Sequence, residues 1–128
     1  MLKKNLIIFS IISIVFFLDF VTKNYAITNL LLNHSEAINT YLNFTLAFNY
    51  GAAFSFLSDA GGWQRWFFVI FSIIVVFFIS YILIKDKESE YISYSLVLGG
   101  ALGNLYDRIF LGYVIDFIEF HYNNFYWP

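Results

Sequence analysis

The feature that most constrains the fold of this chain is an apolar stretch from Trp66 to Ile84 that contains no charged residue. As an α-helix, this stretch covers about 28 Å, close to the thickness of the hydrocarbon core of a bilayer. Over the whole chain 60% of the residues are hydrophobic and 12% are charged, whereas soluble domains average about 25% charged residues. We therefore predict an integral membrane protein with a transmembrane helix over residues 66–84.

A second apolar segment lies at the N-terminus. Residues 6–18 follow the basic start Lys3 and Lys4, as in a cleaved signal peptide, but no small-residue cleavage site comes after them. Because the helical pattern continues to Lys23, we predict a retained transmembrane helix over about 6–23.

A third segment, over about 91–108, is shorter and contains the small residues Gly99, Gly100, Ala101 and Gly103. Small residues let helix backbones approach closely in lipid, where packing drives helix association. The predicted fold class is thus membrane α-helical, with three transmembrane helices in a single domain over residues 1–128.

The basic residues predict how these helices are oriented, because cytoplasmic loops are enriched in lysine and arginine. One side of the membrane would carry Lys3, Lys4, Lys85 and Lys87, and the other Lys23, Arg65 and Arg108. We predict a cytoplasmic N-terminus and a cytoplasmic loop over 85–90. The segments over about 22–65 and after Arg108 would be extracytoplasmic.

Between the first two helices, apolar and polar residues alternate from Leu42 to Asn49. A period of two is typical of a β-strand with one apolar face. Gly51 offers a turn before a second apolar stretch over 52–57. We predict a small extracytoplasmic β-hairpin over about 41–57 at the membrane surface. Its interfacial aromatic anchors would be Tyr50, Trp63 and Trp66.

Composition excludes several classes of function. The formal net charge of -2 and the sequence pI near 5.5 leave no basic surface that would bind nucleic acid. The chain has no cysteine, which excludes disulfides and thiol catalysis. His34 and His121 have no second ligand at helical spacing, so we predict no metal site.

Polar residues in two of the predicted elements are candidates for functional roles. Asp19 lies in an apolar helix, where an ionisable side chain is costly. Lys23 follows one turn later, so a structural ion pair is an equally good interpretation. Asn49 and Gly51 end the predicted strand, where a turn alone would also explain both residue types.

The third helix and the segment after it carry a second polar group. Gly100, Asn104 and Asp107 share one helix face, and Gly100 would form a small notch on it. The adjacent Arg108 can hold a carboxylate ionised through a charge-assisted hydrogen bond. Asp116 lies among apolar residues, which raise the pKa of a carboxyl towards the range useful in acid-base catalysis. A solvated loop aspartate is the alternative interpretation of Asp116.

Three segments combine unlike residue types in a fixed order. They are D-F-V-T-K from Asp19, F-N-Y-G-A-A-F-S-F-L from Phe48, and G-G-A-L-G-N-L-Y-D-R-I-F-L-G-Y-V-I-D-F-I-E-F-H from Gly99. In this order they resemble the motifs of the lipoprotein signal peptidases, also called signal peptidase II. The third segment is long and ungapped, which makes it the most specific of the three.

The resemblance implies an aspartic endopeptidase that spans the bacterial cytoplasmic (inner) membrane several times. Its substrates would be prolipoproteins that carry diacylglycerol on the cysteine that becomes the new N-terminus. It implies no metal or organic cofactor, contact with membrane lipid, no nucleic-acid partner and a monomeric enzyme. The family fold has four transmembrane helices, a small extracytoplasmic sheet and a helix that lies on the membrane surface.

The resemblance also assigns roles to single residues. Asp116 matches one of two catalytic aspartates, which share one proton because two adjacent carboxylates do not both ionise easily. Polar positions that line the family's site correspond to Asn49, Asn104 and Arg108. Positions with structural or electrostatic roles correspond to Asp19 and Asp107. We assign roles of the same kind to Lys23 and Gly51, from the ion pair and the turn described above.

In the family, an F-N-x-A-D block with the second catalytic aspartate and then a fourth helix follow the region H-Y-N-N-F-Y-W-P. The 128 residues end at Pro128, before both. We therefore expect that these residues alone do not process a precursor. The alternative to a peptidase is an inactive truncated membrane protein that retains only lipid or signal-helix binding. A small transporter-like bundle would use the intramembrane polar residues but would not need the long motif.

Overall fold

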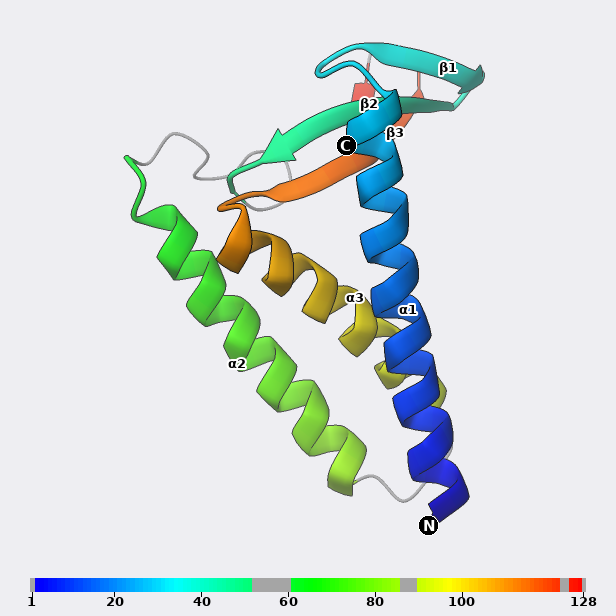
Figure 1. The fold of residues 1–128 in the computed structure, drawn as a ribbon, viewed down its shortest axis with the longest axis vertical. Coiled ribbons are helices and arrows are strands. Elements are labelled where there is room, and N and C mark those ends of the chain that lie inside the picture. The colour runs from blue at the N-terminus through cyan, green and yellow to red at the C-terminus, as the bar shows by residue number, and fades with distance from the viewer. Residues whose placement is uncertain (1, 52–60, 86–89, 123–124, 128) are drawn as a thin grey trace.

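The computed structural model describes residues 2–51, 61–85, 90–122 and 125–127. The elements in chain order are α1 (Leu2–Asn29), β1 (Ser35–Asn39), β2 (Leu42–Asn49), α2 (Gln64–Lys85), α3 (Tyr91–Phe110), β3 (Val114–Tyr122) and β4 (Phe125–Trp127). In Figure 1, α3 runs between α1 and α2 and packs against both. The sheet lies across the C-terminal ends of α1 and α3, and the N-terminus lies at the opposite end of the molecule.

Two of the helices have the length and composition of membrane spans. α1 and α2 are each long and apolar enough to cross a bilayer, and α2 agrees with the helix predicted over 66–84. Both present large apolar side chains outward, with Phe9 70% and Phe77 71% exposed. Contiguous apolar surface of this kind is favourable in contact with lipid or another protein and unfavourable in water.

The prediction that the first helix ends near Lys23 is wrong, because α1 continues to Asn29. Polar side chains in the last turns donate to carbonyl groups four residues back, as Asn29 Nδ2 does to Tyr25 O at 2.8 Å. Ala26 is buried against Leu46 and Ile115 of the sheet. At about 42 Å, α1 is longer than the hydrocarbon core, so its last turns are free to support the sheet.

The four strands form one antiparallel sheet in the order β1-β2-β3-β4. The predicted hairpin over about 41–57 is wrong in its pairing, because β2 forms its hairpin with the preceding β1. This hairpin turns at Asn39, whose side-chain oxygen accepts a hydrogen bond from the backbone N–H of Tyr41 at 2.8 Å. The predicted second arm, residues 52–57, lies outside the described residues.

The second edge of β2 pairs with β3, a strand that the sequence analysis does not predict. β3 is rich in β-branched and aromatic residues, which favour strands. In the β2–β3 register Ala47 lies opposite Asp116, and Asn49 lies opposite Val114. The sheet therefore brings the end of β2 next to the start of β3, although more than sixty residues separate them in the sequence.

Two glycines let α1 and α3 approach closely. A Cβ atom at Gly99 would lie 2.7 Å from Val15 Cβ, and one at Gly103 would overlap the Asp19 carboxylate. A Cβ atom at Gly100 would meet nothing within 4 Å. The close contacts between α1 and α3 thus follow the Gly-x-x-x-Gly spacing of positions 99 and 103, while the space beside Gly100 is open.

This difference gives a prediction with a matched control. Gly99→Ala should lower the free energy of unfolding by about 1–3 kcal/mol, because the added methyl group meets Val15 near its own backbone and cannot be relieved by a rotamer change. Gly100→Ala should be neutral or slightly stabilising, since alanine favours helix more than glycine does. Unfolding of the detergent-solubilised protein, followed by circular dichroism, measures both. Equal effects of the two substitutions would contradict the packing described.

Candidate active site

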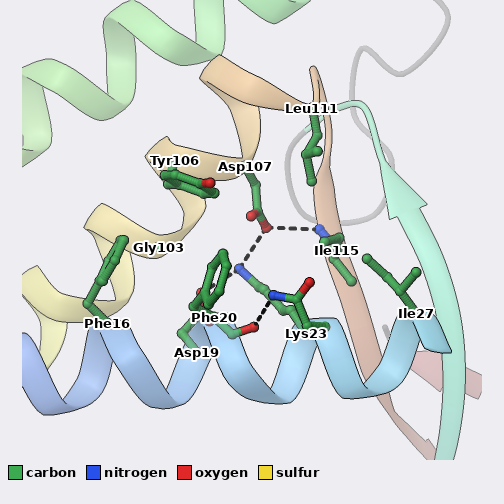
Figure 2. A pocket seen from close by; sticks show the side chains of 11 residues that line it. Phe16, Asp19, Phe20, Lys23, Ile27, Gly103, Tyr106, Asp107, Leu111 and Ile115 are labelled. Carbon is green, nitrogen blue, oxygen red and sulfur yellow. Dashed lines mark hydrogen bonds and ion pairs between the residues drawn. The ribbon is translucent and has the colours of Figure 1, made fainter. Parts of the chain in front are cut away.

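A buried lysine joins α1 to α3 beneath the sheet. Lys23 is 4% exposed, and its ammonium lies 2.8 Å from Asp19 Oδ2, 2.8 Å from Asp107 Oδ2 and 3.0 Å from Asn104 Oδ1. Figure 2 shows the lysine reaching from α1 towards Asp107 on α3. An ammonium group has three N–H donors, so these three acceptors satisfy it completely.

Asp107 extends this cluster to β3. Its side chain is buried, and Asp107 Oδ2 also accepts the backbone N–H of Ile115 at 3.2 Å (Figure 2). We predicted that the neighbouring Arg108 holds a carboxylate here, but the direct ion-pair partner of Asp107 is Lys23. The predicted pairing of Asp19 with Lys23 is confirmed. The cluster thus fixes the backbone immediately before Asp116.

Asp116 and Asn49 meet at the β2–β3 junction. Asn49 Nδ2 donates to Asp116 Oδ2 at 3.0 Å, and Asn49 Oδ1 accepts the backbone N–H of Gly51 at 2.9 Å. The predicted role of Asn49 in the turn is confirmed, and the same amide also contacts Asp116. Its role in the site stays a prediction. Within the described part of the chain, this hydrogen bond reaches only one carboxyl oxygen, which leaves Oδ1 available for a water molecule or a substrate.

Arg108 lies on the last turn of α3 beside this pair. Its Nη2 points to the carbonyl oxygen of Gly51 at 3.5 Å, and its guanidinium lies 5.6 Å from the ring centre of Phe68 on α2. A cation over an aromatic face is held by the ring's negative quadrupole. Arg108 is also close enough to Asp116 to interact with its charge.

Burial raises the pKa of the Asp116 carboxyl above its usual range. The hydrogen bond from Asn49 and the positive charges of Lys23 and Arg108 act in the opposite direction, while the negative charge of Asp107 adds to the rise. Because desolvation is the largest of these effects, the neutral carboxyl gains relative to the carboxylate. A carboxyl poised in this way can both accept and return a proton.

A cavity of about 230 Å³ opens between α2 and α3 next to Arg108. Asn104 and Ser72 are the other polar residues of its wall, and the rest of the wall is apolar: Phe68, Phe71, Val75 and Ala101. A second cavity of about 200 Å³ lies beside Asp19 and Lys23 (Figure 2). Among the described residues, no three histidine, aspartate or glutamate side chains gather as metal ligands would.

The structure brings the predicted site residues into two neighbouring groups. Asp116, Asn49, Gly51 and Arg108 form one, and Lys23, Asp19, Asn104 and Asp107 form the other. Sequence reasoning missed Arg65, which donates hydrogen bonds to the C-terminal end of α3. The sequence does mark Arg65 as unusual, because it lies at the start of a predicted helix, where the helix dipole disfavours a cation. Such a residue is expected to have a partner outside its own helix.

Comparisons with known proteins agree with this architecture. A family model described as signal peptidase (SPase) II matches residues 11–128. The lipoprotein signal peptidase of Dichelobacter nodosus (strain VCS1703A) is 51% identical over 123 residues, which cover 94% of this chain and 79% of that protein. The lipoprotein signal peptidase of Teredinibacter turnerae (strain ATCC 39867 / T7901) is 51% identical over 119 residues, 90% of this chain and 70% of that protein. A solved structure described as a bacterial membrane enzyme has a TM-score of 0.78 and 36% identity, with 89% of this chain and 70% of that chain covered.

Proposed function

Because this chain belongs to the signal peptidase II family, we propose that it cleaves the signal peptide from lipoprotein precursors and that Asp116 is one of its catalytic carboxylates. The observation that carries the proposal is the meeting of Asp116, Asn49 and Arg108 at one end of α3. These residues come from β3, β2 and α3. Packing alone would not require two strand ends and a helix end to place a carboxyl, an amide and a guanidinium together.

The chemistry follows that of two carboxylates that share one proton. One carboxylate removes a proton from water as the oxygen attacks the scissile carbonyl carbon, while the other carboxyl gives its proton to the carbonyl oxygen. Asp116 would supply one of these groups, and the family's F-N-x-A-D block the other. Asn49 would orient Asp116 through Oδ2 and leave Oδ1 to the reacting water.

The neighbouring residues support this role through charge and shape. Arg108 lies where it would stabilise negative charge that develops on the substrate carbonyl oxygen. The apolar wall of the cavity beside it, with Phe71 and Val75, suits an aliphatic chain. We therefore propose precursors with diacylglycerol on the cysteine as substrates, membrane lipid as surroundings, a monomeric enzyme, and no metal or organic cofactor.

We propose the bacterial cytoplasmic membrane as the location, with the N-terminus in the cytoplasm and α3 as a third span. Lys3, Lys4 and Lys85 lie on helix ends opposite the sheet (Figure 1), which supports this orientation. Reporter fusions after Ser89 and after Ala60 measure it. Alkaline phosphatase is active only when exported, so activity is expected at Ala60 and not at Ser89. The reverse pattern would contradict the topology.

The proposed function has a direct cellular test. The complete gene, and not residues 1–128 alone, is expressed in bacteria depleted of their lipoprotein signal peptidase, and a labelled prolipoprotein is followed on a gel. We expect the precursor to be converted to the mature form. Persistence of the precursor, with the protein present in the membrane fraction, would refute the proposed activity.

A further inference from the structure

Arg65, at the start of α2, donates two hydrogen bonds to the backbone of another helix, α3. Its Nε donates to the carbonyl oxygen of Arg108 at 3.1 Å, and its Nη2 donates to that of Ile109 at 2.6 Å. Both acceptors lie in the last turn of α3, 43 and 44 residues away in the sequence. Arg65 therefore joins the beginning of one helix to the end of another.

These bonds complete the C-terminal end of α3. The last carbonyls of a helix have no partner within the helix and carry the negative end of its dipole. The carbonyl of Asp107 accepts the N–H groups of Leu111 and Gly112 at 2.7 and 3.1 Å. The next two carbonyls are the ones that Arg65 binds. The guanidinium is planar and holds its donors in one rigid fork, so it binds two successive carbonyls with less loss of side-chain freedom than a lysine ammonium would.

Arg65 also supports the turn that leads from α3 into β3. Gly112 has a φ of 90°, a backbone conformation that favours glycine. A Cβ atom at Gly112 would lie 3.5 Å from Cδ, Nε and Cζ of Arg65, so the arginine lies directly against this turn. From Gly112 the chain enters β3 and reaches Asp116 four residues later.

Helix α2 thus holds Arg108 at two points. Arg65 binds the backbone carbonyl of Arg108, and Phe68, one turn further along α2, lies under the Arg108 guanidinium. A shift of the last turn of α3 would move Arg108 relative to both Phe68 and Asp116. Phe68 is buried, so its ring and the Arg65 hydrogen bonds together hold the end of α3 from the α2 side, as the Lys23 cluster holds it from α1.

We propose that Arg65 is a positioning residue for peptide cleavage, one that holds Arg108 and the turn before Asp116 in the arrangement the reaction needs. This inference rests on the proposed function. Arg65 acts through the backbone of α3 and not on the substrate, so its loss should reduce the rate of the chemical step more than substrate binding. A displacement of about 1 Å in a catalytic group can cost about 100-fold in rate.

The test measures steady-state cleavage of a purified prolipoprotein by the detergent-solubilised protein, expressed from its own gene. Arg65→Gln should lower kcat by about 10- to 100-fold and change KM by less than about 3-fold. Arg65→Lys keeps the positive charge but loses the paired guanidinium donors that bind the two carbonyls, so it should recover only part of kcat. The control is Lys85→Gln at the other end of α2, which should leave kcat unchanged.

A pH profile separates positioning from general loss of structure. Asp116 faces Asn49 from β2, Lys23 from α1, and Arg108 and Asp107 from α3. If Arg108 moves away, its lowering of the Asp116 pKa weakens, so the acidic limb of the kcat profile should move to higher pH in Arg65→Gln. Loss of folded enzyme alone would lower every point equally.

Two results would overturn the inference. One is a kcat of Arg65→Gln within about 2-fold of the unsubstituted protein, and the other is full recovery of kcat and pH profile in Arg65→Lys. If Arg65→Gln does not fold, Arg65→Lys decides the matter. A lowered kcat at an unchanged Tm supports positioning, and an unchanged kcat refutes it. If the unsubstituted protein does not cleave the precursor, the proposed function fails instead.

Discussion

Replacing Asp116 by asparagine should lower the rate of precursor cleavage by at least about 1,000-fold, while the protein stays folded in the membrane. General acid-base catalysis alone contributes about 100- to 10,000-fold, and members of a catalytic pair act as a unit. Asparagine keeps the shape of the side chain and can still accept the hydrogen bond that Asn49 donates, but it cannot carry a proton between water and the substrate.

The stability of Asp116→Asn should depend on pH in a definite direction. Because burial raises the pKa of Asp116, the ionised carboxylate costs folding free energy as the pH rises from about 4 through the raised pKa. The neutral asparagine removes this cost. At neutral pH the variant should therefore be at least as stable as the unsubstituted protein, and this advantage should disappear below about pH 4.

A carboxylate on the same strand provides the matched control. Glu119 is in β3 and accepts a hydrogen bond from Asn43 Nδ2 at 2.7 Å, away from Asn49 and Arg108. Glu119→Gln should keep nearly full activity, since an amide oxygen can accept the same bond. Processing of a labelled prolipoprotein in depleted cells compares the variants. Retained cleavage by Asp116→Asn would remove Asp116 from the catalytic pair.

Lys23→Met should lower the free energy of unfolding by about 3–5 kcal/mol, the cost of breaking a buried ion pair by removing one partner. Asp107 is 4% exposed, and methionine would leave its carboxylate beside that of Asp19 with no cation between them. Lys3→Met at the exposed start of α1 is the control and should change stability by less than about 0.5 kcal/mol. Denaturant or thermal unfolding of the solubilised protein measures the difference.

A double substitution tests whether the charge pair, and not the lysine stem, is responsible. Replacing a buried ion pair by apolar residues of similar volume is often neutral, so Lys23→Met combined with Asp107→Leu should recover part of the loss. The recovery appears as a coupling energy in the double-mutant cycle. If Lys23→Met alone is as stable as the unsubstituted protein, the cluster does not hold α1 to α3.

The same cluster shows how far the candidate site could be predicted. The spacing of Asp19 and Lys23 within one helix correctly predicts their ion pair, because positions four apart face each other on any α-helix. The contact of Lys23 with Asn104, 81 residues away, depends on how α1 packs on α3. The pairing of Asp107 with Lys23 depends on the same packing, and sequence adjacency wrongly favoured Arg108.

The apolar helices and β2 could also be predicted from the sequence, because long apolar runs and a period of two show which faces of a segment avoid water. Local chemistry did not predict where α1 ends, because its last turns pack on the sheet, where Ala26 is buried with Leu46 and Ile115. The sequence analysis also missed β3, although its composition favours a strand, and only the structure shows that it pairs with β2. Element ends and strand partners are tertiary properties.

The sequence by itself determined that this chain is apolar enough for a membrane, which family it belongs to, and which carboxyl, amide and guanidinium are available for chemistry. The tertiary structure alone decided that Asn49 binds Asp116, that Lys23 is shared by two aspartates, and that Arg65 completes the end of α3. The physical reason is that residue type and spacing fix what a side chain can bind. Which partner lies within 3 Å depends on backbone packing between segments that are distant in the chain.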